Sequence, residues 1–386
     1  MPANLSPFAL KLGAFYAAYF LFGGIQLPFF PLWLEARGLD ARAIGLVIAI
    51  PTVVRIVFTP IAAHQADRRH ALKAALVLAS SVATLAMLLL GVVEGFAAIL
   101  VTYTIAAVAF SPVLSLTDAY ALSGLRARGR AYGPVRLWGS VAFIAGNVGA
   151  GFLLEAMAPG QLIWLLAGAL SVSIIAAIAL EPLDAPLATP EQVTPARRDF
   201  WRNPAFMAVV VGAALVQSSH ALYYGFSTLD WRAAGFDGRT IGLLWGLGVL
   251  AEIVLFAVSA RLPAWLSPTA MMAIGATGAV IRWTAMAFDP PAALLPALQL
   301  LHAASFGATH LGTMGFLARA VPRPFAATAQ GTLATVSGIV SATAMATSGL
   351  VYAASGSLAY LVMAGMALAG LACALFASRA IAKTPE

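Results

Sequence analysis

Six ionisable side chains lie inside long apolar stretches of this sequence, where an unpaired charge is costly. They are Arg55, Asp118, Arg136, Glu252, Arg282 and His302. An ionisable group at the centre of a lipid bilayer costs at least ~2.5–3.5 kcal/mol, so it needs a partner or a wet cavity. We therefore interpret these residues as the candidate functional site of a membrane protein.

Asp118 and Arg136 lie on two consecutive apolar segments that are joined by a short basic loop. Two antiparallel helices would bring them close together. The planar guanidinium of Arg136 suits a carboxylate or a hydroxyl-rich ligand. The alternatives are an interfacial arginine that extends to the cytoplasmic surface, and an Asp118–Arg136 pair that only locks two helices.

Glu252, Arg282 and His302 combine an acid, a counter-charge and a group that titrates near neutral pH. Such a set could bind and release a proton as the protein changes shape. The alternative is a static buried ion pair that holds the second half of the chain together. Arg55 is a further candidate for this role, because an internal repeat places it opposite Glu252.

Five aromatic residues inside the apolar stretches could line a cavity and contribute to substrate binding. They are Tyr16, Tyr19, Trp138, Tyr223 and Tyr224. A single aromatic residue in such a stretch is more often a packing residue or an interface anchor. The adjacent Tyr223 and Tyr224 lie in the middle of their segment, where an interface role fits less well.

The composition sets the fold class, because 61% of the 386 residues are hydrophobic and only 10% are charged, with a mean hydropathy of +0.90. Continuous apolar runs of about 20 residues predict an all-α membrane protein and exclude a β-barrel, whose strands alternate. We predict twelve spans: 8–34, 41–62, 71–92, 96–122, 134–154, 161–180, 204–229, 239–260, 267–287, 291–318, 325–350 and 356–378.

The longest polar connection, residues 181–203, divides the chain into a first six-span bundle (1–180) and a second (204–386). Of the 22 lysines and arginines, 15 fall on the side that carries both termini and this linker, and 4 on the other side. The positive-inside rule therefore predicts cytoplasmic termini. The net charge of +7 reflects this topology, so we expect no nucleic-acid partner.

The two halves contain a repeated segment. Residues 38–46 (GLDARAIGL) and 235–243 (GFDGRTIGL) are identical at six of nine positions, at an offset of 197. Both lie between the first and second span of their half. Same-direction repeats of six spans are typical of transporters whose halves move about a midplane site.

Motifs for hydrolysis, zinc proteolysis and phosphate binding are absent from the sequence, and its histidines are not spaced as metal ligands. We therefore expect no enzyme activity, no cofactor and no metal.

The sequence resembles the major facilitator superfamily, and within it the phenylpropionate permease group, which is related to lactose permease-like oligosaccharide and nucleoside proton symporters. The resemblance covers nearly the whole chain. It rests on LPFFPLWL (27–34), SPVLSLTDA (111–119), YGPVRLWGSVAF (132–143), YYGFSTLDWRAAG (223–235), LWGLGVLAE (244–252), IRW (281–283) and LHAASFGATHLG (301–312).

The resemblance implies two pseudo-symmetric six-helix bundles. It implies that Asp118 and Arg136 bind substrate, and that Glu252, Arg282 and His302 take part in proton coupling. Lactose-type relatives carry an acid three residues after the histidine, whereas this sequence has Ser305 there. More of the proton transfer would then fall to Glu252 or Asp118.

We therefore expect a monomeric, proton-coupled symporter that imports a small organic solute across a bacterial inner membrane by alternating access. An aromatic carboxylate such as a phenylpropionate-like acid is the first expected cargo. Its partners would be this solute, protons and the lipid bilayer. The alternatives are a sugar or nucleoside symporter, an exporter of amphipathic compounds, and a non-transporting membrane receptor or scaffold.

Overall fold

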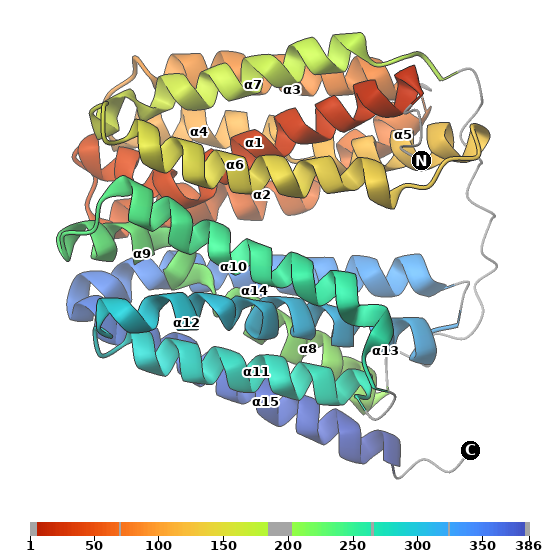
Figure 1. The fold of residues 1–386 in the computed structure, drawn as a ribbon, viewed down its shortest axis with the longest axis vertical. Coiled ribbons are helices and arrows are strands. Elements are labelled where there is room, and N and C mark those ends of the chain that lie inside the picture. The colour runs from red at the N-terminus through yellow and green to blue at the C-terminus, as the bar shows by residue number, and fades with distance from the viewer. Residues whose placement is uncertain (1–5, 69–70, 184–202, 264–265, 323–324, 383–386) are drawn as a thin grey trace. The chain divides into compact units, whose positions relative to one another are not determined.

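A computed structural model describes residues 6–68, 71–183, 203–263, 266–322 and 325–382. Every regular element within these ranges is helical (Figure 1). Proximity of Cα atoms groups the chain into two compact units, a first unit of Met1–Thr189 with Trp231–Gly246 and a second unit of Pro190–Asp230 with Leu247–Glu386. The division at a linker of 181–203 stays a prediction, because residues 184–202 lie outside the described ranges.

The first unit contains seven α-helices in its described residues, besides the start of α10 and the end of α9. They are α1 (Pro7–Ala36), α2 (Ala41–Arg68), α3 (Leu72–Leu90), α4 (Phe96–Phe110), α5 (Val113–Ala127), α6 (Gly133–Leu153) and α7 (Leu162–Ala179), the last preceded by the short 3₁₀ helix η1 (Pro159–Gln161). Helix α1 packs against α6 and α7, and α3 packs against α4 and α7.

The second unit holds the remaining helices. They are α8 (Pro204–Ser218), α9 (Ala221–Ala233), α10 (Gly238–Val258), α11 (Pro268–Met286), α12 (Leu295–Leu300), the π-helical segment η5 (Ala303–Ala308), α13 (Thr309–Ala320), α14 (Ala326–Ser355) and α15 (Tyr360–Ala382), with short 3₁₀ helices η3 (Ser259–Arg261), η4 (Ala292–Leu294) and η7 (Gly356–Ala359). Helix α8 packs against α14 and α15, and α11 packs against α13 and α15.

The twelve predicted spans are each matched by a helical segment. Nine stretches of the described residues are long and apolar enough to cross a membrane, and one of them, Thr328–Ile381, takes in both α14 and α15. Helices α6 and α11 occupy the two other predicted spans, 134–154 and 267–287. The prediction of an all-α, twelve-span architecture is confirmed.

Three spans that we expected to be continuous are interrupted. The span 96–122 breaks at Ser111 and Pro112, because proline has no backbone N–H to continue the helix. The span 204–229 breaks at Ser219 and His220, and the span 291–318 passes through the π-helical η5. By contrast, α1 continues through Pro28 and Pro31, so these prolines do not end a helix.

The repeated segment forms the same helix-to-helix turn in both halves. Gly38 and Gly235 have φ angles of +80° and +88°, a left-handed conformation that glycine adopts without a steric penalty. The following Asp40 and Asp237 each accept a backbone hydrogen bond, at 2.8 Å, from the residue three positions later. The bonds from Thr240 hold the pKa of the Asp237 carboxyl below its usual value. The two repeated segments therefore share a glycine that follows the end of one helix and an aspartate that caps the start of the next.

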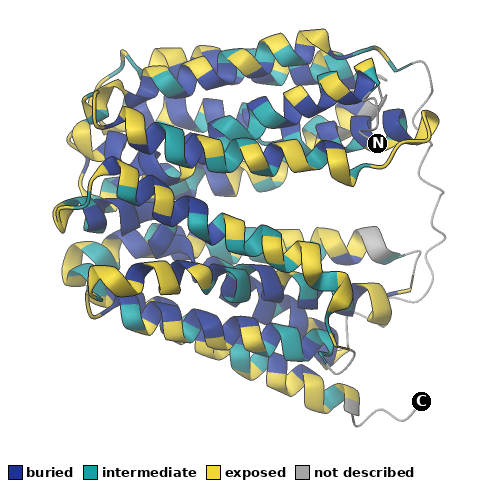
Figure 2. Cartoon of the chain, in the orientation of Figure 1, coloured by how far each residue is buried: buried dark blue, intermediate teal, exposed yellow. Residues whose placement is uncertain are grey.

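Large apolar side chains cover much of the accessible surface. Exposed positions recur along the helices (Figure 2). Leu78 and Leu85 on α3 are each 66% exposed, and Ile175 on α7 is 68% exposed. A water-soluble protein rarely exposes large apolar side chains along so many of its helices, so these faces fit a lipid environment.

Small residues let α1 and α6 approach closely. A Cβ atom built on Gly146 would lie 2.7 Å from the carbonyl oxygen of Leu21 and 3.2 Å from the Cα of Gly24. Both are backbone atoms, which cannot move aside without shifting α1. Close backbone approach at small residues is a main source of helix association in membranes.

We expect Gly146→Ala to lower the stability of the protein by about 1–3 kcal/mol, the usual cost of overpacking a well-packed contact. Gly149→Ala on the same helix is the matched control, because a Cβ atom there meets nothing within 4 Å. That control should be neutral or should stabilise by ~0.5–1 kcal/mol through helix propensity. Thermal unfolding in detergent measures both, and equal midpoints for the two variants would contradict the packing role of Gly146.

Candidate functional site

Asp118 is held by two tyrosine hydroxyls in the first unit. Its Oδ1 atom accepts hydrogen bonds from Tyr16 at 2.5 Å and from Tyr132 at 2.8 Å. Tyr16 lies on α1 and is fully buried, Asp118 lies on α5, and Tyr132 directly precedes α6. The carboxylate therefore joins three elements of this unit.

Arg136 lies on the first turn of α6 and rests on aromatic rings. Its guanidinium carbon is 4.0 Å from the ring centre of Phe20 and 5.5 Å from that of Tyr16. Its guanidinium forms no ion pair or hydrogen bond with any described residue, and no ion pair joins it to Asp118. The half-buried cation is thus positioned by ring faces and leaves its planar N–H edge available.

The other predicted residues of the first unit differ in how they relate to this pair. Tyr19 stacks on Phe110 at 4.9 Å and meets Phe20 edge-on, so it joins the aromatic surface that supports Arg136. Trp138 is 50% exposed and packs against Gly13 of α1. Arg55 is exposed on α2. The structure therefore groups Tyr16 and Tyr19 with Asp118 and Arg136, and the charge of Arg55 acts on the Tyr19 hydroxyl. No contact with these residues adds Trp138 to the group.

Arg282 is the centre of a buried polar network in the second unit. It lies on α11 with 0% of its surface exposed. One terminal nitrogen, Nη2, donates to Oε1 of Gln299 at 2.7 Å, and the other, Nη1, lies 3.1 Å from Nδ1 of His302. The guanidinium also lies 4.5 Å from the ring centre of Tyr223 and 4.7 Å from that of Trp283.

His302 connects Arg282 to the half-buried acid Glu252. Its Nε2 atom lies 3.5 Å from Oε2 of Glu252, on α10. A guanidinium can only donate, so the contact at Nδ1 requires that nitrogen to be an acceptor. We infer that His302 is neutral and carries its proton on Nε2, directed at Glu252. The three residues therefore form one chain from acid to histidine to arginine, as their types in the sequence predict.

The adjacent Tyr223 and Tyr224 contact different parts of the site. The Tyr223 hydroxyl donates to Oε1 of Gln299 at 2.9 Å, so Tyr223 belongs to the Arg282 network. Tyr224 is half-buried, and its ring lies 5.7 Å from that of His220. His220 in turn bonds Ser305 through Nε2 at 3.1 Å. Ser305, which replaces the expected acid, is thus a partner of His220.

The π-helical η5 begins immediately after His302, and its neighbours have little side-chain bulk. Gly248 of α10 faces the Cβ atom of His302, and Gly278 of α11 faces that of Ala304. Gln217 donates its amide to the carbonyl oxygen of Phe306 at 3.3 Å, which pairs one backbone group of this segment. Small residues on both sides therefore let a wide helical turn fit at the level of the polar network.

Three residues of the site were not predicted from the sequence. Gln299 shares a helical face with His302 at a spacing of three residues, and this spacing could have identified it. Tyr132 lies outside the predicted spans, and Phe20 looks like any apolar residue of α1. Among the described residues, no group of three or more histidine, cysteine or acidic side chains could hold a metal ion.

Comparison with known proteins assigns the class of this chain. Residues 9–362 match the MFS_1 like family. The chain belongs to this family. Membership confirms the resemblance drawn from the sequence motifs and makes the protein a multi-pass membrane transporter of the major facilitator type, not an enzyme.

Curated relatives of this MFS_1 like protein are transporters. It is 33% identical over 318 residues to the "Probable 3-phenylpropionic acid transporter" of Escherichia coli, with 80% of this chain and 81% of the relative covered. It is 24% identical over 285 residues to the "Maltose permease" of Geobacillus stearothermophilus, covering 72% and 70%.

Solved structures share its fold. The crystal structure of the nucleoside transporter NupG superimposes with a TM-score of 0.83 at 14% identity, covering 99% of this chain and 100% of that one. A bacterial homologue of the human lysosomal transporter Spinster, in an inward-facing and unoccupied conformation, gives a TM-score of 0.76 at 14% identity, with 100% of both chains covered. These likenesses confirm the major facilitator fold.

Proposed function

We propose that this transporter carries an aromatic carboxylate of the phenylpropionate type and couples its movement to protons. The observation that carries the proposal is the Arg136 guanidinium, which lies on the Phe20 ring without an acidic partner among the described residues. A carboxylate would pair with the free N–H edge, and a phenyl group would pack on the adjacent rings. The Escherichia coli relative, a probable 3-phenylpropionic acid transporter, supports the same cargo class.

Asp118 supports this assignment by its own pairing. Its contacts with Tyr16 and Tyr132 leave the charge of Arg136 available to a ligand. They also place the phenol ring of Tyr16 beside the cation, because Tyr16 contacts both Asp118 and Arg136. We propose that Asp118 orients Tyr16 and that Arg136 binds the carboxylate, with Tyr19 and Trp138 as further parts of the substrate surface.

For the coupled proton we propose Glu252 as the carrier. His302 cannot take a second proton at Nδ1 while Arg282 donates to that atom, because two donors would then face each other. Glu252 is the acid at one end of the row of contacts that joins Glu252, His302 and Arg282. The position three residues after His302, where lactose-type relatives have an acid, is Ser305 in this sequence. Two buried donors of this network, Nε of Arg282 and Nε2 of Gln299, have no hydrogen-bond partner among the described residues. Buried donors without a partner are typical of functional networks. Arg55 remains a further candidate for the coupling step, and Tyr223 and Tyr224 remain candidates for substrate binding.

The remaining assignments rest on the sequence. From the distribution of basic residues we propose that both termini lie in the cytoplasm. The internal repeat supports alternating access, and by likeness to the permease group we further propose import by a monomer across a bacterial inner membrane. Uptake of labelled 3-phenylpropionate, maltose and uridine into proteoliposomes with an imposed pH gradient tests the cargo. Accumulation of the sugar or nucleoside but not of the acid would overturn the proposal, and loss of preloaded acid against the gradient would indicate an exporter.

We expect Arg136→Lys to weaken phenylpropionate binding tenfold or more, equivalent to ~1.4 kcal/mol or more of binding free energy. Lysine keeps the charge but loses the planar fork and the stacking on Phe20. Calorimetric titration of the purified protein measures the dissociation constant. Arg42→Lys, at an exposed position of α2, is the control and should bind as the wild type does. Equal affinity in both variants would exclude Arg136 from the binding site.

A further inference from the structure

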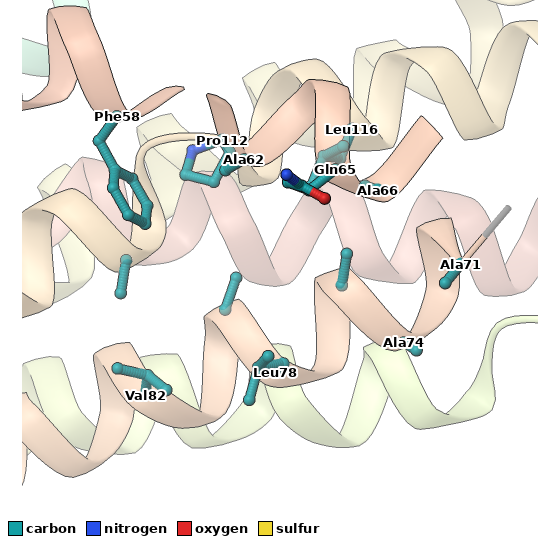
Figure 3. Close-up of a pocket in the computed structure, with 13 residues that line it drawn as sticks. Phe58, Ala62, Gln65, Ala66, Ala71, Ala74, Leu78, Val82, Pro112 and Leu116 are labelled. Atoms are coloured by element: carbon teal, nitrogen blue, oxygen red, sulfur yellow. The ribbon is translucent and has the colours of Figure 1, made fainter. Parts of the chain in front are cut away.

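The first unit contains a cavity that belongs to neither polar cluster. It has a volume of about 380 Å³ and lies between α2 and α3, with the α4–α5 break behind it (Figure 3). Of the thirteen lining residues only Gln65 has a polar side chain, and seven are alanines. None of the proposed substrate or proton residues lines it.

The cavity exists because α2 and α3 follow each other along the chain but barely touch, while each packs on α4 or α5. Alanines form much of the α3 wall, at Ala71, Ala74, Ala75 and Ala79, so no long side chain fills the gap. On the opposite wall Pro112 lies in the break between α4 and α5, where the chain is not helical. The space therefore follows from residue sizes at the wall.

The cavity opens beside an exposed apolar surface. Phe58 and Leu78, at its rim, are 41% and 66% exposed, and Val57 and Ile61 on α2 are 66% and 53% exposed. In a membrane protein such apolar faces are covered by acyl chains. A chain that entered this cavity would exchange one apolar environment for another and would gain contact with the alanine wall.

The two ends of the cavity differ in polarity. Phe58 and Val82 form one end, whereas Gln65, Ala66 and Ala71 lie at the other, next to the α2–α3 connection (Figure 3). An apolar shaft with a polar amide at one end matches the polarity of a phospholipid.

We propose that the α2–α3 cavity is a binding site for one phospholipid, whose acyl chain lies along the alanine wall and whose headgroup lies at the Gln65 end. The site is independent of the substrate proposal, since the two share no residue.

Filling the cavity tests this. The wild type, purified in dodecyl maltoside, should retain about one phospholipid per protein, measured by native mass spectrometry and by lipid extraction. Ala79→Phe should lower the amount of retained phospholipid at least fivefold, because the new ring fills space beside the α3 wall of the cavity. Leu85→Phe is the matched control, since Leu85 lies on the same helix, is 66% exposed and does not line the cavity. It should retain the lipid.

Four outcomes would overturn the proposed site. Three concern the lipid: the wild type retains no phospholipid, it retains only detergent, or Ala79→Phe retains as much phospholipid as the wild type. The fourth is loss of phenylpropionate binding in Ala79→Phe, which would show that the cavity binds the cargo. If Ala79→Phe does not fold, Ala79→Leu replaces it, and the motionally restricted fraction of a spin-labelled phospholipid is measured in membranes. A restricted fraction equal to that of Leu85→Phe would refute the proposal.

Discussion

Arg282→Ala is expected to abolish transport and to lower the free energy of unfolding by about 3–5 kcal/mol, the usual loss when one partner of a buried charged network is removed. Arg282 bonds Gln299 and His302 and lies over Tyr223 and Trp283, all without solvent contact at the arginine. Its removal leaves the buried acceptors of Gln299 and His302 without their donor and releases the ring of His302. Thermal unfolding and uptake in proteoliposomes measure the two losses.

Two variants separate charge from geometry at this position. Arg282→Lys keeps the charge but cannot reach Gln299 and His302 with two fixed donors, so we expect it to recover part of the stability and little of the transport. Arg42→Ala removes an exposed arginine and should change neither. Transport by Arg282→Ala at the wild-type rate would show that the network has no part in the transport cycle.

Glu252→Gln is expected to abolish proton-driven accumulation while preserving substrate exchange. Glutamine has nearly the same shape, and its carbonyl oxygen can still accept the Nε2 proton of His302, so the network should keep its geometry. It cannot bind and release a proton, so a pH gradient should no longer raise the internal substrate concentration above the external one. Exchange of labelled for unlabelled substrate should continue, because it needs no net proton movement.

The control for this variant is Glu35→Gln, at an exposed acid near the end of α1. It should accumulate substrate as the wild type does. If Glu252→Gln still accumulates substrate in response to pH, then the coupled proton binds elsewhere, and Asp118 becomes the next acid to test. If exchange is lost as well, Glu252 has a structural role in the network instead.

The sequence was sufficient for the fold and for the second polar cluster. Long apolar runs predict spans because every backbone group in lipid must be paired within a helix. Within such runs Glu252, Arg282 and His302 stand out because charge is rare there, and the structure joins them in one chain. The repeat at Gly38 and Gly235 was visible because a left-handed turn restricts residue choice.

Other features depended on three-dimensional contacts that sequence position does not encode. Asp118 and Arg136 were natural partners by charge, yet the structure pairs the acid with Tyr16 and Tyr132 and stacks the arginine on Phe20. Phenols and phenyl rings are common in apolar runs, so their sequence carries no sign of this choice. Gln299 was not predicted, because an uncharged amide costs less in lipid than a charge and is therefore a weaker sign of a functional residue.

The π-helical turn at Ala303–Ala308 has a consequence for the residues that follow it. A wide turn holds one residue more than an α-helical turn, so a regular helical wheel drawn from His302 assigns later positions about 100° away from their true direction. Thr309 and Thr313 are buried, whereas His310 is exposed. Deleting one residue within the wide turn would restore regular winding and leave the direction of α13 unchanged, because the turn absorbs the extra residue. Deleting one residue within the regular helix of α13 would instead turn every later side chain of that helix by about 100°.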